Sequence, residues 1–467
     1  MENKKTEAQL LKEKLFMERK HGGLVLSEAE LSEVQAYCED YKAFLDEAKT
    51  EREAVVRAIK MAEKKGFVPF VRGTAYKPGD KVYMNNRGKA IIFAVVGTDP
   101  IENGVNLMTA HIDSPRLDLK VNPLYEDNEV GYFKTHYYGG IKKYQWTAIP
   151  LSLHGVIVRA DGSSVTVRVG EDAGDPVFCV TDLLPHLAAD QVKLPLHEGI
   201  KGEQLNILIG SHPFRDDEAS ERVKLNLMKT LFEKYGIVEK DFRSAELTAV
   251  PAFPAKDIGF DRSFIGAYGQ DDRVCAYTAF TALLGAEAPR RTAVVVMADK
   301  EETGSEGTTG MSAAYLPNFL KDLAECFGQN GRVVMSNSKC LSADVNAAFD
   351  PNFPEVSESR NTCYVNYGAV ITKYTGARGK SGTSDASAEF AGEVQHMLDE
   401  NNVLWQTGEL GKVDQGGGGT VAFCTAALDI DTIDIGVPVL SMHSPFEVTS
   451  KIDVYSTYRA FSTFIAS

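Results

Sequence analysis

Two histidines and several carboxylates stand next to short apolar runs that have the character of buried strands. They are Glu301 and Glu302 after residues 292–297, His111 and Asp113 after 106–110, Asp344 after 332–335, His443 after 433–440, and Asp271 and Asp272 before a helical pattern at 273–285. In open α/β sheets, ligands bind outside the carboxyl ends of the strands. We therefore expect these side chains to converge on one site, although His111 and His443 are far apart in the sequence.

The residue types indicate metal chemistry. Imidazole and carboxylate ligands suit Zn²⁺, Mn²⁺ or Co²⁺ better than metals that prefer thiolates. Two histidines and three carboxylates can hold two ions if one carboxylate bridges them at a separation of about 3.5–4 Å. On an extended chain, Asp113 lies on the same side as His111 and can fix the tautomer of its imidazole. The pattern thus favours a two-metal site.

A structural interpretation of each piece remains open. A single histidine or acid at a strand end is more often a cap, and Asp271 with Asp272 fits the charge preference of a helix N-terminus. Successive side chains on a strand point to opposite faces. Glu301 and Glu302 can therefore share a site only if the strand ends near Ala298 and a turn follows around residues 303–304. The joint pattern favours this arrangement over a charged loop.

The elements needed to position these residues can be read from periodicity. Residues 5–66 have helical spacing, with a capping box at Ser27 and Glu30. Strands are expected at 89–96, 106–110, 292–297, 332–335 and 433–440, and helices at 273–285, 311–323 and 384–401. Residues 121–250 contain short alternating segments separated by glycine and proline. We predict an α/β domain formed by residues 1–120 and 251–467, interrupted by a β-rich insertion at 121–250.

Composition limits the possible functions. A chain of 467 residues suggests two or three domains, at about 150 residues per domain. The net charge of −15 argues against binding to nucleic acid or to an anionic membrane. No apolar run approaches the roughly 18 residues that cross a bilayer, and the charged N-terminus lacks a signal-peptide core. Seven scattered cysteines without a CxxC pair argue against a disulfide framework. We expect a cytoplasmic protein.

In their order along the chain, the motifs resemble those of the M18 family of metalloaminopeptidases, in its bacterial form. The motifs are TAHIDSP at 109–115, the pair Asp271 and Asp272, DKEETGSE at 299–306, SAD at 342–344 and SMHS at 441–444. The resemblance covers residue 80 or so to the C-terminus. It implies a phosphorylase/hydrolase-like α/β catalytic domain, a dimerisation domain at 121–250, and a homo-oligomer, namely a dodecamer built from dimers.

The resemblance also implies roles for individual residues. His111 and Asp344 would bind one metal ion, Glu302 and His443 the other, and Asp271 would bridge the two; Glu301 would be the general base, and Asp113 would orient His111. Two zinc ions are implied, with manganese or cobalt as substitutes. Relatives often carry Asn where this chain has Asp272, so the choice of Asp271 as the bridge rests on motif order.

The implied reaction is removal of the N-terminal residue from peptides with a free N-terminus. Two metal ions lower the pKa of a water molecule and polarise the scissile carbonyl. Glu301 would take the proton of that water and deliver it to the leaving amine. The residue types leave the preferred N-terminal residue open between acidic and neutral side chains.

Candidate substrate contacts are less specific than the metal ligands. His186 would reach the active site of a neighbouring subunit, with His136 as the alternative. Lys373 and Lys380 could bind a substrate carboxylate, and Gly418, in the glycine run 416–419, could let backbone N–H groups approach the substrate. Ordinary loop roles for these residues remain open.

Two other functions remain open at this point. Carboxypeptidases and N-acyl-amino-acid deacylases of related two-metal folds place similar ligands at their strand ends. A non-catalytic, self-assembling binding protein could keep the fold, although here every ligand position is filled by a suitable residue.

Overall fold

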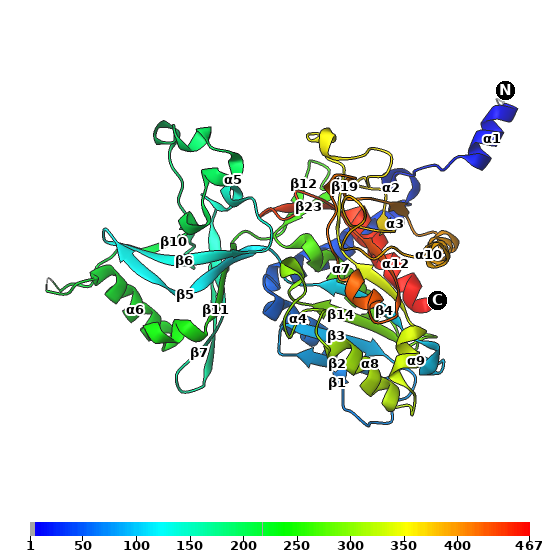
Figure 1. The fold of residues 1–467 in the computed structure, drawn as a ribbon, viewed down its shortest axis with the longest axis horizontal. Helices are drawn as coiled ribbons and strands as arrows, with labels where there is room; N and C mark the ends of the chain where they lie inside the picture. The colour runs from blue at the N-terminus through cyan, green and yellow to red at the C-terminus, as the bar shows by residue number, and fades with distance from the viewer. Residues whose placement is uncertain (1–4, 217) are drawn as a thin grey trace.

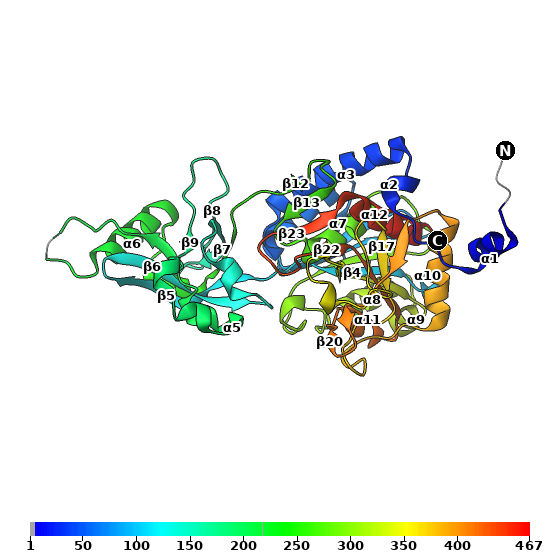
Figure 2. The same ribbon diagram turned by 90° about the horizontal axis from the view of Figure 1, so that it is seen from above.

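The apolar runs of the sequence form a nine-stranded mixed sheet at the centre of the larger of two lobes (Figures 1 and 2). This computed structural model describes residues 5–216 and 218–467, so residues 1–4 and 217 of the predicted domains lie outside the described residues. The strand order is β1 (Val68–Pro69), β2 (Lys81–Asn86), β3 (Ala90–Val95), β14 (Ala293–Ala298), β4 (Asn106–His111), β15 (Lys339–Ala343), β21 (Asp431–Gly436), β17 (Ala369–Thr372) and β18 (Trp405–Thr407). The four neighbours β14, β4, β15 and β21 are parallel.

Helices cover both faces of this sheet, so the side chains on either side of its central strands are buried. One face packs against α3 (Glu28–Glu47), α4 (Glu51–Glu63), α7 (Gln270–Leu284), α10 (Ala388–Glu400) and α12 (Lys451–Ala466). The other packs against α8 (Tyr315–Glu325), α9 (Gly331–Ser336) and α11 (Ala422–Ala426). On β4, for example, Met108 belongs to the first core and Leu107 to the second.

The smaller lobe contains an antiparallel sheet of seven strands with its own apolar core. Its order is β8 (Ser164–Val169), β7 (Leu151–Val158), β11 (Glu246–Pro251), β5 (Arg116–Asp127), β6 (Val130–Tyr138), β10 (Ile207–Gly210) and β9 (Cys179–Val180). Helix α6 (Arg222–Tyr235) packs on it, and α5 (Leu196–Gly199) lies in a loop region. The chain enters this lobe along β5 and leaves it along β11.

A third sheet and several short elements complete the larger lobe. The third sheet has the order β12 (Lys256–Ile258), β13 (Phe264–Ala267), β23 (Glu447–Ser450), β22 (Pro438–Leu440) and β16 (Asn346–Ala347). A hairpin pairs β19 (Gly411–Lys412) with β20 (Gln415–Gly416), and α1 (Glu7–Leu15) and α2 (Gly22–Val25) precede α3.

Within the described part of the chain, no helix is both long and apolar enough to cross a membrane. All seven cysteines are free thiols.

The prediction of a strand at residues 332–335 is wrong. These residues belong to helix α9, whose N-cap Asn330 accepts the backbone N–H of Arg332, and the strand is β15, at Lys339–Ala343. A short apolar run cannot by itself distinguish a strand from a buried helix. In addition, residues 433–440 divide between β21 and β22, which lie in different sheets. Helix α10 begins at Ala388, after the N-cap Ser387.

Candidate active site

The candidate site lies at the carboxyl ends of the parallel strands. His111 is the last residue of β4, Asp344 directly follows β15, and Glu301 and Glu302 follow β14 after a two-residue turn. His443 comes from the connection between β22 and β23, and Asp271 from the first turn of α7. The fold thus brings together the residues that the sequence placed at strand ends, because neighbouring parallel strands end at one edge.

Asp271 lies between the two histidines. Its Oδ1 is 3.2 Å from Nε2 of His111, and its Oδ2 is 3.1 Å from Nε2 of His443. In both rings Nδ1 lies near a backbone carbonyl, that of Asp113 at 3.0 Å and that of Gly140 at 2.8 Å. Because a carbonyl only accepts, each Nδ1 carries a proton, and each Nε2 faces the carboxylate.

Several carboxylates lie close together around His111. Ligand atoms of His111, Asp271 and Glu302 lie within 4.8 Å of one another, as do those of His111, Asp272 and Asp344. Among the described residues, Glu302 Oε1 and Asp272 Oδ1 are buried and accept no hydrogen bond. Burial, together with nearby carboxylates, raises the pKa of Glu302 and of Asp344 well above the usual values. Such a concentration of oxygen ligands fits divalent cations.

The pKa values of the histidine–aspartate core show how strongly these groups interact. Burial opposes ionisation of Asp271, but hydrogen bonds with His111 and His443 outweigh it and hold the pKa of Asp271 below its usual value. Burial also opposes protonation of His443, yet Asp271 and Glu302 raise the pKa of His443 to about 10. The imidazoles and the Asp271 carboxylate thus stabilise one another's charged forms.

Asp113 is fully buried, and its carboxylate contacts four residues at the site. Its Oδ1 accepts the backbone N–H of Glu301 at 3.1 Å and lies 3.3 Å from Nδ1 of His111. Its Oδ2 accepts the backbone N–H of Glu302 at 3.2 Å and the hydroxyl of Tyr138 at 2.7 Å. One carboxylate therefore fixes a predicted ligand and the turn that carries both glutamates.

The turn separates the two glutamates by exposure. Strand β14 ends at Ala298, and a single turn of 3-10 helix spans Glu301–Thr303, with left-handed residues at Lys300 and Gly304. The side chain of Glu302 is 3% exposed and that of Glu301 is 18% exposed, with Oε2 of Glu301 3.7 Å from Nε2 of His111. Burial raises the pKa of Glu301. Glu301 is thus the more accessible of the two carboxylates to a substrate.

Three neighbours of the ligands were given no role by the sequence. Asp272 accepts the backbone N–H of His111 at 3.3 Å, and only the doublet with Asp271 drew attention to it. Glu447 accepts the backbone N–H groups of Asp271 at 3.0 Å and His443 at 2.7 Å. Tyr138 reaches Asp113 from the smaller lobe. Glu447 and Tyr138 carry no sequence signal, because their partners are distant in the chain.

Among the described residues, the predicted substrate contacts form no hydrogen bond or ion pair with the metal-ligand cluster. Lys373 and Lys380 both bind the carboxylate of Asp385, at 2.6 and 2.8 Å, so their charges are already paired. His186 lies in the 3-10 turn Pro185–Leu187 of the smaller lobe and is exposed. Gly418 lies between β20 and α11, in a loop that ends at Thr420, whose hydroxyl donates to the buried Asp434 at 2.8 Å.

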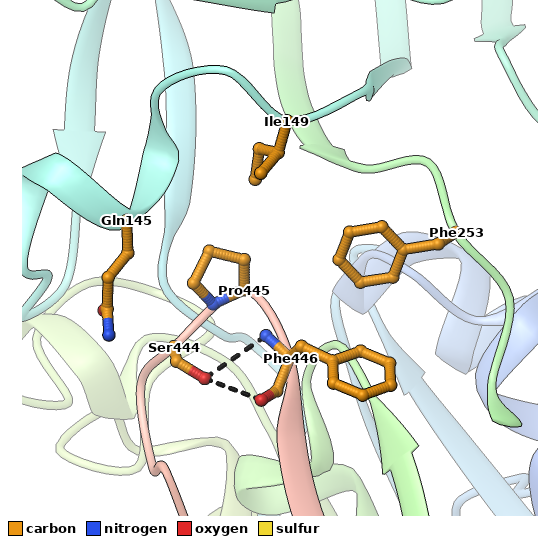
Figure 3. A pocket seen from close by; sticks show the side chains of 6 residues that line it. All are labelled: Gln145, Ile149, Phe253, Ser444, Pro445 and Phe446. Carbon is orange, nitrogen blue, oxygen red and sulfur yellow. Dashed lines mark hydrogen bonds between the residues drawn. The ribbon is translucent and has the colours of Figure 1, made fainter. Parts of the chain in front are cut away.

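Two hollows border the site. His136 and Thr303 help to line an open hollow of about 890 Å³ between the lobes. A second, apolar hollow of about 420 Å³ lies beside the turn that carries His443, and its lining is shown in Figure 3. Ile149 and Phe253 face Pro445 and Phe446 across it. The linings include Ser444 and Thr303, the residues that follow His443 and Glu302 in the chain.

Comparison with known proteins identifies relatives over nearly the full chain. The sequence model of the family described as aminopeptidase I zinc metalloprotease (M18) matches residues 44–465. A probable M18 family aminopeptidase 1 from Clostridium acetobutylicum is 50% identical over 97% of this chain and 99% of that protein. The crystal structure of an M18 family aminopeptidase from Thermotoga maritima has a TM-score of 0.92 at 45% identity, covering 96% of this chain and 99% of that one. The mApe1 dodecamer of S. cerevisiae, at 21% identity and a TM-score of 0.73 over 91% of this chain and 95% of that one, shares the fold.

Proposed function

The chain belongs to the M18 family of zinc metallopeptidases and is an aminopeptidase, and we propose that it hydrolyses peptides at a centre of two divalent ions. The observation that carries this proposal is the position of Asp271, whose two carboxylate oxygens each face the Nε2 atom of a different histidine. A carboxylate in that position is suited to bridge two cations.

The proposed ligand sets divide around this bridge. His111 and Asp344 would hold one ion, and Glu302 and His443 the other. The Glu302 oxygen that accepts no hydrogen bond and the raised pKa values of Glu302 and Asp344 support cation binding there. Asp272, whose ligand oxygen lies near His111 and Asp344, is a further candidate on that side. Zinc is the proposed metal, with manganese or cobalt as substitutes, because the donor set accepts each of them.

The catalytic roles follow from position. When bound, the ions supply Lewis acidity that polarises the substrate carbonyl and lowers the pKa of water. Glu301 accepts the proton of the attacking water and transfers it to the leaving amine; its greater exposure supports this role over that of Glu302. Asp113 orients His111 and the turn that carries Glu301.

We further propose that the substrate is a peptide with a free N-terminus. His186 would contribute to the site of a neighbouring subunit in a homo-oligomer, a dodecamer built from dimers, with His136 as the alternative. Exposure of His186 on the smaller lobe supports contact with another copy. Lys373, Lys380 and Gly418 remain candidate substrate contacts; the two lysines would first have to separate from Asp385.

The proposed organisation assigns residues 1–120 and 251–467 to a phosphorylase/hydrolase-like catalytic domain and residues 121–250 to a dimerisation domain. The separate core of the smaller lobe supports this division. The proposed location is the cytoplasm, which the seven free thiols support, because thiols persist in reducing compartments.

The function is tested with aminoacyl anilides of Asp, Glu and Leu, each compared with its N-acetylated form, using enzyme reconstituted with zinc. We expect turnover of the free amines and none of the blocked forms. Turnover of the blocked forms would instead indicate a deacylase if acetate is released, or an endopeptidase if the aniline is released, and either outcome would overturn the aminopeptidase mechanism.

A further inference from the structure

Residues at the end of strand β6, in the smaller lobe, contact the metal-ligand cluster. Tyr138 is the last residue of β6, and Gly139 and Gly140 follow it. These three residues contact Asp113, Glu302 and His443, which lie around Asp271. The rest of β6 pairs with β5 and β10 in the smaller lobe. The larger lobe alone therefore does not supply all the partners of the proposed ligands.

Gly140 fixes one histidine directly. Its carbonyl oxygen lies 2.8 Å from Nδ1 of His443. Because this oxygen can only accept, the contact sets the tautomer of His443 and turns Nε2 toward Asp271 and Glu302. A ligating histidine usually donates its second ring nitrogen in this way, and the partner determines the orientation of the ring.

Tyr138 acts on the other histidine through Asp113. The Tyr138 hydroxyl donates to Asp113 Oδ2 at 2.7 Å, and Asp113 in turn contacts His111 and the backbone of both glutamates. The guanidinium of Arg116 lies 4.1 Å from the centre of the Tyr138 ring, which holds the ring in place. The hydroxyl also satisfies one acceptor position of the buried Asp113 carboxylate, and loss of such a hydrogen bond is costly.

Gly139 packs against Glu302, a proposed ligand of the second metal ion. Its φ is +73°, and a Cβ at this position would lie 3.1 Å from Oε2 of Glu302 and 3.3 Å from its Cβ. Because these contacts are tighter than usual for a Cβ, a side chain here would require Glu302 to shift by a few tenths of an ångström. The segment therefore also limits where Glu302 can lie.

We propose that Tyr138, Gly139 and Gly140 form a positioning element through which the smaller lobe sets the orientation of His111, His443 and Glu302 within the same chain. The inference rests on the proposed two-metal function, but it concerns residues outside the ligand set. It gives the smaller lobe a part in the metal site in addition to its proposed role in dimerisation.

The first test compares Tyr138→Phe with Tyr137→Phe in the full-length, zinc-loaded enzyme. Both variants lose one hydroxyl, but Tyr137 is 42% exposed, and its hydroxyl makes no hydrogen bond to any residue that the structure describes. Zinc affinity is measured by competition with a chromogenic chelator, and kcat and KM on a free-amine anilide. For Tyr138→Phe we expect about tenfold weaker zinc binding and about tenfold lower kcat with little change in KM. Equal zinc affinity and kcat in the two variants would overturn the proposal.

A second comparison uses glycines and does not depend on the tyrosine. Gly139→Ala is compared with Gly162→Ala, because Gly162 has a similar φ of +82° but nothing within 4 Å of a Cβ. Both variants carry backbone strain, and only the first meets Glu302. We expect zinc affinity to fall at least tenfold for Gly139→Ala and to stay within twofold for Gly162→Ala. Equal zinc affinities would contradict the proposed contact with Glu302.

The pathway through Asp113 is tested by combining substitutions. If Tyr138 acts through this carboxylate, Tyr138→Phe should change zinc affinity less than twofold in an Asp113→Asn background. A full tenfold effect in that background would show that the hydroxyl acts by another route and would contradict this step. Zinc binding and turnover by the wild-type enzyme test the proposed function, whereas the paired comparisons test only this inference.

Discussion

The backbone N–H of Glu301 donates to Asp113 Oδ1 at 3.1 Å, so the carboxylate beside His111 also holds the turn of the proposed base. This relationship links one proposed ligand to the position of the proton acceptor. A change at Asp113 should consequently affect both metal binding and catalysis.

Asp113→Asn is expected to lower zinc affinity and kcat, each by about 10- to 100-fold, because the amide provides only one acceptor oxygen for the three donors. Chelator competition measures the first quantity and steady-state kinetics the second. Asp161→Asn, on an exposed turn of the smaller lobe, is the matched control. If Asp113→Asn retained the wild-type zinc affinity and kcat, the orienting role would be incorrect.

Glu301→Gln and Glu302→Gln should separate the two adjacent acids. We expect Glu301→Gln to keep two zinc ions and to lose about 10²- to 10⁴-fold in kcat, because only proton transfer is removed. Glu302→Gln should bind zinc more weakly, since a proposed ligand is neutralised. Metal content after gel filtration and kcat are measured for both variants. The reverse pattern would exchange the two roles.

Glu447→Gln is expected to destabilise the fold by about 1–3 kcal/mol, because an amide cannot accept from both backbone N–H groups that meet the carboxylate. Urea unfolding of the metal-free protein measures this loss without a contribution from zinc. Glu325→Gln, at an exposed position near the end of α8, should leave the stability nearly unchanged. Equal midpoints for the two variants would argue against a structural role for Glu447.

Stability at acidic pH should depend on Glu171. Burial opposes its ionisation, but His154 and Lys49 outweigh burial and lower the pKa of Glu171 to about 2. Because the pKa is lower in the folded state, the stabilisation is present above about pH 4.5 and is lost as the pH falls toward 2. The stability advantage of the wild type over Glu171→Gln should therefore shrink between pH 4.5 and 2. Unfolding in the presence of chelator measures it, and a constant difference would refute the assignment.

Removal of the metal should abolish turnover and lower the melting temperature. Ligands that bind only the folded state stabilise it by about 2.7 kcal/mol when their concentration is 100 times Kd. Addition of zinc, manganese or cobalt to the chelated enzyme should restore both properties to different degrees. Full activity in a preparation shown to be free of metal would exclude the proposed mechanism.

The sequence alone predicted the central part of the fold and the residues of the candidate site. The apolar runs at 106–110 and 292–297 became β4 and β14 because buried parallel strands require continuous apolar residues. The end of β14 at Ala298 was predicted because Glu301 and Glu302 can share a site only if the strand stops there and a turn follows. The run at 332–335 was ambiguous, because three apolar residues satisfy a helix as well as a strand, and its helical cap Asn330 was overlooked.

Only the tertiary structure decided how the site residues are held. The doublet of Asp271 and Asp272 is symmetric in sequence, and the backbone at the start of α7 is what turns the Asp271 carboxylate toward both histidines. The contacts of Tyr138, Gly140 and Glu447 join segments that are distant in the chain. Local periodicity reports which residues form an element, whereas hydrogen bonds between elements depend on how the elements pack. For that reason the sequence determined which residues are proposed as metal ligands, and the fold determined their orientation.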